Sequence, residues 1–165
     1  MIITLIGFMG SGKTYIGNKL SISSNLPFID LDYYISKKCK LSINDIFLNF
    51  GESYFRKKEN ESLIELSLKD NFILSSGGGI IELPKNRLIL KDHKFLKVFL
   101  NPDLETIMER IYHSKRPIVK KSSRKDLISL YQKRLNYYYD LADISIQTTD
   151  SDQIIQKILE IAKNS

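Results

Sequence analysis

The chain of 165 residues contains one cysteine and no long apolar run. Because Cys39 has no partner, no disulfide can form within the chain, which favours a reducing compartment. We expect Cys39 to be a partly buried small apolar residue. Every apolar run is far shorter than the about 20 residues that cross a membrane, and the N-terminus lacks the basic region and cleavage site of a signal peptide. We therefore expect a cytoplasmic protein that does not bind a membrane.

Clustered basic residues with interleaved aromatics are also lacking. The formal net charge is +6 and the pI about 9.3, yet the basic residues are spread along the chain. Small anionic molecules explain the excess charge as well as nucleic acid does, and we expect no nucleic-acid partner. With 42% hydrophobic and 27% charged residues, the composition is that of one globular domain covering residues 1–165.

The hydrophobic period alternates between that of strands and that of helices, which predicts an α/β fold with a five-stranded parallel sheet. The expected strands are Ile2–Ile6, Phe28–Asp30, Phe72–Ser75, Phe95–Leu100 and Ile144–Gln147. The expected helices are Lys13–Ser23, Tyr33–Lys38, Ile43–Phe50, Glu52–Lys69, Pro84–Lys91, Asp103–Ile111, Arg124–Leu141 and Asp152–Lys163. In such sheets ligands bind beyond the carboxyl ends of the strands, so the residues that follow each strand are candidates for function.

A P-loop follows the first expected strand. Gly7 to Thr14 reads Gly-Phe-Met-Gly-Ser-Gly-Lys-Thr and precedes an expected helix. Glycines let backbone N–H groups approach phosphates, Lys13 reaches the outer phosphates, and the Thr14 hydroxyl suits Mg²⁺. A glycine turn that merely caps a helix would match all four fixed positions by chance only rarely, so the motif predicts nucleotide-phosphate binding.

Two carboxylates follow the second expected strand. In an extended chain Asp30 and Asp32 point the same way, toward the cleft beside the P-loop. Phosphoryl transfer to a hydroxyl uses one carboxylate near Mg²⁺ and another that accepts the hydroxyl proton. The alternative is that Asp32 only caps the helix that begins at Tyr33.

Glycines and an arginine form two further candidates. Gly77, Gly78 and Gly79 follow the third expected strand and would let a ligand approach the main chain, although a flexible turn is the alternative. Arg56 and Glu59 lie three residues apart on an expected helix. They could form a surface ion pair, or Glu59 could orient Arg56 for a bidentate grip on a carboxylate.

The stretch from His113 to Lys125 is rich in lysine and arginine and contains Pro117. It is either a solvated loop or a lid that excludes water and delivers an arginine to the transferred phosphate. Arg134 lies on the next expected helix, where ordinary packing of a surface helix is the alternative to a functional role. The two histidines, His93 and His113, are expected to be exposed loop residues.

Together these motifs resemble the shikimate kinase family, which belongs to the P-loop folds similar to nucleoside-monophosphate kinases. The resemblance covers nearly the whole chain. It rests on the P-loop, the aspartate pair, Arg56 with Glu59, the glycine triplet, Arg116-Pro117, and Arg134 with Tyr138 and Ala142. It implies a three-layer α/β/α fold, a mobile lid at about 112–124 and a substrate-binding helical segment at about 32–61.

The resemblance also implies transfer of the γ-phosphoryl group of ATP to the 3-hydroxyl of shikimate, a step toward aromatic amino acids, with one Mg²⁺ ion. The implied catalytic residues are Lys13, Asp32 and Arg116. The implied shikimate-binding residues are Asp32, Arg56, Gly77, Gly78, Gly79 and Arg134. The implied nucleotide-binding residues are Gly10, Ser11, Gly12, Lys13, Thr14, Tyr15, Arg110 and Arg116. Thr14 and Asp30 are the implied Mg²⁺ residues, and residues 148–152 the implied adenine loop.

Other functions remain open from the residues alone. Gluconate kinases and nucleoside-monophosphate kinases share the fold, but two arginines with Asp32 suit a compact carboxylate-bearing polyol. A GTPase-like switch is disfavoured, because no Asp-x-x-Gly follows the P-loop and no Asn-Lys-x-Asp is present. A basic nucleic-acid-binding module predicts salt-sensitive binding to oligonucleotides. We expect a monomer that binds ATP and shikimate.

Overall fold

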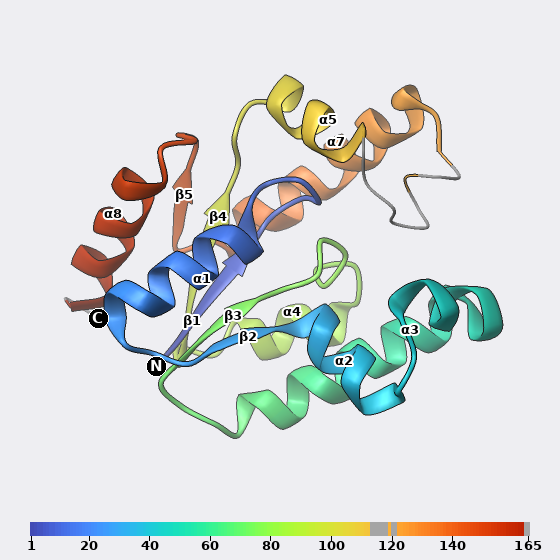
Figure 1. The fold of residues 1–165 in the computed structure, drawn as a ribbon, viewed down its shortest axis with the longest axis horizontal. Helices are drawn as coiled ribbons and strands as arrows, with labels where there is room; N and C mark the ends of the chain where they lie inside the picture. Colours follow the sequence, from blue (N-terminus) through green and yellow to red (C-terminus); the bar gives the residue numbers. More distant parts are fainter. Residues whose placement is uncertain (113–118, 120–121, 164–165) are drawn as a thin grey trace.

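The computed structural model describes residues 1–112, 119 and 122–163 of the chain. Its centre is a parallel five-stranded sheet in the order β2-β3-β1-β4-β5 (Figure 1). The strands are β1 Ile2–Ile6, β2 Phe28–Asp30, β3 Phe72–Ser75, β4 Phe95–Leu100 and β5 Ile144–Ile146. The expected parallel sheet is confirmed, and only the end of β5 differs, by one residue.

Burial on both faces explains the composition of the central strands. All residues of β1, β3 and β4 are buried, whereas the edge strands β2 and β5 are only partly covered. In β1, Ile2 pairs with Phe72 on one side and with Phe95 on the other. These strands are mostly apolar, with Thr4, Ser75 and Lys97 as buried exceptions, which is typical of parallel strands that are covered by helices on both faces.

Helices cover both faces of the sheet and complete three layers (Figure 1). The helices of the described residues are α1 Lys13–Ser24, α2 Leu31–Cys39, α3 Ile43–Ser67, α4 Pro84–Leu90, α5 Leu104–Tyr112, α7 Arg124–Leu141 and α8 Ser151–Lys163. Residues of α1 and α8 form one apolar cluster with the sheet, and residues of α2, α3, α4, α5 and α7 form the other. The three-layer α/β/α architecture is therefore confirmed.

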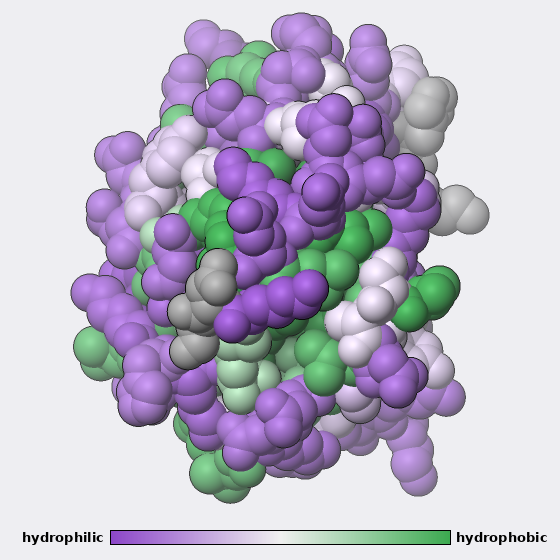
Figure 2. Space-filling model, turned by 90° about the vertical axis from the view of Figure 1, so that its left-hand side faces the viewer, coloured by the Kyte–Doolittle hydropathy of each residue, from purple (hydrophilic) through white to green (hydrophobic). Residues whose placement is uncertain are grey.

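The outer surface on the α1 and α8 side is mostly hydrophilic, with smaller hydrophobic patches between the polar side chains (Figure 2). This agrees with α8, where Ile154, Ile155 and Ile158 are buried and the intervening polar residues are exposed. Among the described residues, no helix is both long enough and apolar enough to cross a membrane.

Two expected boundaries concern the site. The break expected between the helices at 43–50 and 52–69 is confirmed, because α3 has a kink with non-helical backbone at Gly51 (φ 78°, ψ 175°). Helix α2 begins at Leu31 instead of Tyr33, because the carboxylate of Asp30 accepts a hydrogen bond from the backbone N–H of Tyr33 and caps the helix. Asp32 is therefore in the first helical turn and is not extended.

Candidate active site

The P-loop connects β1 to α1. Gly12 takes a left-handed conformation (φ 95°) at the N-cap of α1, and among the described residues no side chain caps this helix end. Its first backbone N–H groups are therefore available to an anion. The side chain of Lys13 is buried, and its Nζ donates to the carbonyl oxygens of Gly7 and Phe8 at 2.8 Å each. The lysine is held inside the loop, beside the place where phosphates would lie.

Thr14 and Asp30 lie side by side, as the sequence analysis expects. The Thr14 hydroxyl donates to Oδ2 of Asp30 at 2.7 Å and lies 3.5 Å from Oγ of Ser75. Mg²⁺ prefers oxygen ligands, keeps several waters, and is commonly held by one or two carboxylates together with phosphate oxygens. This donor set fits that pattern, and the described residues contain no cluster of three acidic, histidine or cysteine side chains that would hold a metal without a nucleotide.

Asp32 borders two cavities. One, of about 290 Å³, runs along the P-loop and is also lined by Lys13, Thr14 and Asp30. The other, of about 310 Å³, is lined by Arg56 and Arg134 among others and is called the acid cavity below because these two cations could bind an acid. The alternative that Asp32 merely caps α2 is wrong, because the cap is Asp30. A carboxylate placed between two cavities can accept a proton from a group in one of them while facing the other.

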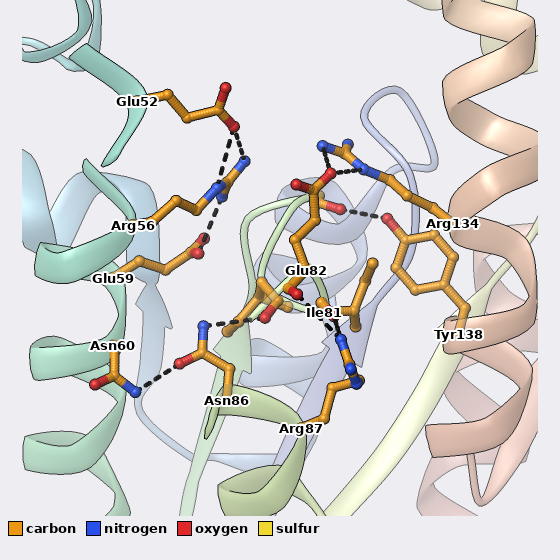
Figure 3. Close-up of polar contacts among 12 residues, drawn as sticks. Glu52, Arg56, Glu59, Asn60, Ile81, Glu82, Asn86, Arg87, Arg134 and Tyr138 are labelled. Atoms are coloured by element: carbon orange, nitrogen blue, oxygen red, sulfur yellow. Dashed lines mark hydrogen bonds and ion pairs between the residues drawn. The ribbon is translucent and has the colours of Figure 1, made fainter. Parts of the chain in front are cut away.

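The acid cavity lies between α3, the glycine triplet and α7. Its walls include apolar side chains from the N-terminal part of α3 and five charged side chains. The charged residues that line it are Asp32, Glu52, Arg56, Glu59 and Arg134. Arg56 on α3 and Arg134 on α7 point toward each other from opposite sides (Figure 3). The structure thus brings together two guanidinium groups from distant parts of the sequence.

Arg56 does not form a simple surface ion pair. Its Nη1 donates to Oε2 of Glu59 at 3.0 Å, and its Nη2 donates to Oε1 of Glu52 at 3.1 Å. The Glu59 side chain is fully buried and the Arg56 side chain is 12% exposed. The surface alternative is therefore wrong, and a glutamate pair fixes the orientation of this arginine inside the cavity wall.

Burial also changes the acidity of Glu59. Loss of solvent raises the pKa of Glu59 to about 7, with a further increase from Asp32, although Arg56 opposes the shift. The second carboxylate oxygen of Glu59, Oε1, is buried and has no hydrogen-bond partner among the described residues. Glu59 thus holds Arg56 with one oxygen and keeps the other without a donor.

Arg134 is held by a residue that the sequence analysis did not find. Oε1 of Glu82 accepts a hydrogen bond from Nε of Arg134 at 2.7 Å and forms an ion pair with its Nη2 at 2.6 Å. The Arg134 side chain is 3% exposed and its guanidinium lies over the Phe8 ring. One turn further along α7, the hydroxyl of Tyr138 donates to the carbonyl oxygen of Gly78 (Figure 3). Burial raises the pKa of Tyr138, so this hydroxyl stays protonated as a donor.

The glycine triplet passes close to these side chains. A Cβ atom at Gly77 would lie 2.9 Å from Oδ1 of Asp32 and 2.9 Å from Oε1 of Glu59. A Cβ atom at Gly79 would lie 2.1 Å from Nη2 of Arg56. Gly77 and Gly79 therefore let these side chains approach the main chain closely, which the alternative of a flexible turn does not explain.

A third cavity, of about 280 Å³, adjoins the other end of the P-loop. Tyr15, Arg110, Thr148 and Thr149 line it together with apolar residues, and Nη1 of Arg110 donates to the carbonyl oxygen of Gly10 at 3.3 Å. This cavity is therefore lined by the start of the expected adenine loop and by four of the expected nucleotide-binding residues, which are Ser11, Gly12, Tyr15 and Arg110.

Some expectations fall elsewhere. Arg116, Pro117 and His113, and most of the expected lid at 112–124, lie outside the described residues. His93 is fully exposed, as expected. Ser75 and Glu52 line the site, and neither was singled out from the sequence. Ser75 could have been found because it ends β3, at the edge of the sheet where ligands bind.

A P-loop at the end of the central strand, a threonine-carboxylate pair, and an adjoining cavity with two arginines define a small-molecule kinase of the nucleoside-monophosphate-kinase-like class. Comparison with known proteins makes the class more specific. The family model described as shikimate kinase matches residues 9–163, and the chain belongs to the shikimate kinase family.

Individual relatives agree over nearly the full length. The shikimate kinase of Dictyoglomus turgidum is 44% identical over 96% of this chain and 95% of that protein. The shikimate kinase of Lactococcus lactis is 42% identical over 97% of both chains. The structure of shikimate kinase from Acinetobacter baumannii in complex with shikimate has a TM-score of 0.91 at 32% identity, over 99% of this chain and 93% of that one.

Proposed function

We propose that the protein transfers the γ-phosphoryl group of ATP to the 3-hydroxyl of shikimate, giving shikimate 3-phosphate and ADP. One observation carries the proposal: Asp32 lines both the P-loop cavity and the acid cavity. A hydroxyl that binds Asp32 therefore faces the place where the P-loop would hold the outer phosphate. Because phosphoryl transfer is mainly a matter of placing the two reactants, this juxtaposition supports the reaction.

The acceptor would be held by charge and by backbone. Arg56 and Arg134 bind its carboxylate, and the glycine triplet, Gly77 to Gly79, binds ring hydroxyls through the main chain. Asp32 accepts the hydrogen bond of the 3-hydroxyl and takes its proton as the oxygen attacks the γ-phosphorus. In a loose transition state this proton leaves late, so orientation by Asp32 matters more than its basicity.

The donor would be held by the P-loop. The N–H groups of Gly10, Ser11, Gly12, Lys13 and Thr14 surround the phosphates, and Lys13 Nζ leaves its carbonyl partners for phosphate oxygens. Thr14 directly, and Asp30 through water, would hold one Mg²⁺ ion, which neutralises phosphate charge. Tyr15 and Arg110 line the third cavity, which would receive the adenine ring. Arg116 would reach the phosphates from a lid at about 112–124.

The proposal includes one domain at 1–165, with the substrate-binding helical segment at about 32–61, acting as a monomer in the cytoplasm without a nucleic-acid or membrane partner. Its test is ADP release by the purified protein with shikimate, gluconate, AMP and CMP as acceptors. We expect shikimate to be strongly preferred. A preference for gluconate or for either nucleotide would reject the substrate while leaving the kinase class intact.

A further inference from the structure

Glu82 lies between the glycine triplet and α4 and holds Arg134 by its Nε and Nη2 edge (Figure 3). The hydrogen bond from Nε and the ion pair with Nη2 reach the same carboxylate oxygen, Oε1. Among the described residues, Glu82 supplies the only hydrogen bond and the only ion pair of this guanidinium group. The long, flexible side chain of Arg134 is thereby restricted to one orientation.

Glu82 contacts Arg134 at the edge of the acid cavity, and its carboxylate is drawn between the guanidinium groups of Arg56 and Arg134 in Figure 3. Arg134 is one of the described residues that line the cavity, whereas Glu82 is not. The carboxylate therefore grips one edge of the guanidinium and leaves the Nη1 side for a ligand. On α3, Glu59 and Glu52 hold Arg56 in a similar way, but both of these glutamates line the cavity themselves.

Glu82 is itself well fixed. Its backbone N–H donates to the carbonyl oxygen of Gly79 at 3.0 Å, and its own carbonyl oxygen accepts from Nη1 of Arg87 at 3.1 Å. The Arg87 guanidinium in turn lies 4.4 Å from the centre of the Tyr137 ring on α7. The segment that carries Glu82 is thus braced against the helix that carries Arg134.

Two links one helical turn apart join α7 to the triplet segment. Glu82 contacts Arg134, and Gly78 accepts the hydrogen bond of Tyr138. Under the proposed function, Arg134 binds the carboxylate of the acid and the triplet binds its hydroxyls. The two links would therefore set the spacing between these two binding elements.

We propose that Glu82 is a positioning residue that holds the Arg134 guanidinium in place for the carboxylate of the acceptor. This inference rests on the proposed function, in which Arg134 binds the acid. A negative charge beside a cation could instead compete with the acid for that cation, and the competing role predicts an effect of opposite sign.

The test measures shikimate binding by calorimetry without nucleotide, together with steady-state kinetics. For Glu82→Ala we expect about tenfold weaker binding and an equal rise in KM for shikimate, because the charge-assisted hydrogen bond that orients Arg134 is lost. The KM for ATP and kcat should change by less than about twofold. Glu82→Gln keeps an acceptor oxygen and should restore part of the loss. Glu61→Gln, which breaks the exposed pair with Lys58, is the matched control and should change nothing.

A second background separates positioning from general damage. Because Glu82 acts through Arg134, Glu82→Ala should cause no further loss in an Arg134→Ala protein. Equal or tighter shikimate binding by Glu82→Ala, or the same additional loss in both backgrounds, would overturn the inference. If Glu82→Ala does not fold, the same outcomes apply to Glu82→Gln. A wild-type protein that neither binds nor phosphorylates shikimate rejects the proposed function and this inference together, whereas an active wild type with unaffected Glu82 variants rejects the inference alone.

Discussion

The P-loop and the acid cavity meet at Asp32 but differ in the chemical groups that form them. The P-loop is one short segment whose backbone N–H groups and buried Lys13 lie within eight consecutive residues. The acid cavity collects side chains from α2, α3 and α7 and main chain from the triplet, and glutamates hold its two arginines. Backbone recognition is thus local in sequence, whereas side-chain recognition here depends on the whole fold.

The largest expected effect distinguishes the two aspartates at the meeting point. We expect Asp32→Asn to lower kcat by about 10²-fold or more, with Mg·ATP affinity nearly unchanged, since Asp32 would face the acceptor in the proposed reaction. Asp30→Asn should instead weaken Mg·ATP binding, and asparagine preserves the α2 cap. Nucleotide titration and single-turnover assays measure both. Equal loss of nucleotide affinity in the two variants would show that their roles are wrongly divided.

Arginine-to-lysine changes should affect the acid cavity alone. Arg56→Lys and Arg134→Lys keep the charge but lose the planar fork, so kcat/KM for shikimate should fall by about 10-fold to 10²-fold. The KM for ATP serves as the internal control and should stay within about twofold. Unchanged shikimate kinetics would remove the substituted arginine from the site.

Glycine-to-alanine substitutions in the acid cavity and in the P-loop should each affect a different substrate. The new Cβ of Gly79→Ala would displace the Arg56 guanidinium, so we expect about a tenfold rise in KM for shikimate. In Gly12→Ala the Cβ has room, but the left-handed backbone (φ 95°) disfavours alanine. This variant should weaken ATP binding instead. The comparison fails if both variants change the same KM.

The smallest expected effect concerns pH and stability. Glu59 has a folded-state pKa of about 7, above its ordinary value of 4.5, so the folded protein favours the neutral acid. Its contribution to the free energy of unfolding is fully present below pH 4.5 and is lost as the pH rises through 7. Glu59→Gln is neutral throughout, so it should gain stability relative to wild type over this interval. Denaturant unfolding at several pH values measures the difference, and a constant difference would contradict the raised pKa.

The local features were predictable because they depend on neighbouring residues. The strand boundaries, the P-loop and the Thr14-Asp30 pair follow from apolar runs, glycine spacing and the rule for strand ends. The rule of alternation placed Asp32 in the right region for a wrong reason. It assumed extended chain, whereas the carboxylate of Asp30 starts a helix one residue after β2.

The partners of the arginines were less predictable. Glu59 could be paired with Arg56 because helical spacing of three residues puts them on one face. Glu82 is 52 residues from Arg134 and lies in a segment without a periodic pattern, so only the packing of α7 against the triplet brings them together. The kink in α3 was expected as a break between two helices, since glycine ends helical patterns.

Gly51 joins the first part of α3, which carries Ile43, Asn44 and Phe47 of the cavity wall, to the part that carries Arg56. Nothing lies within 4 Å of a Cβ placed there, so space does not demand glycine. The backbone does, because φ 78° with ψ 175° is open essentially to glycine alone. Any other residue would be strained at this position, and relief of that strain would move Ile43, Asn44 and Phe47 relative to Arg56.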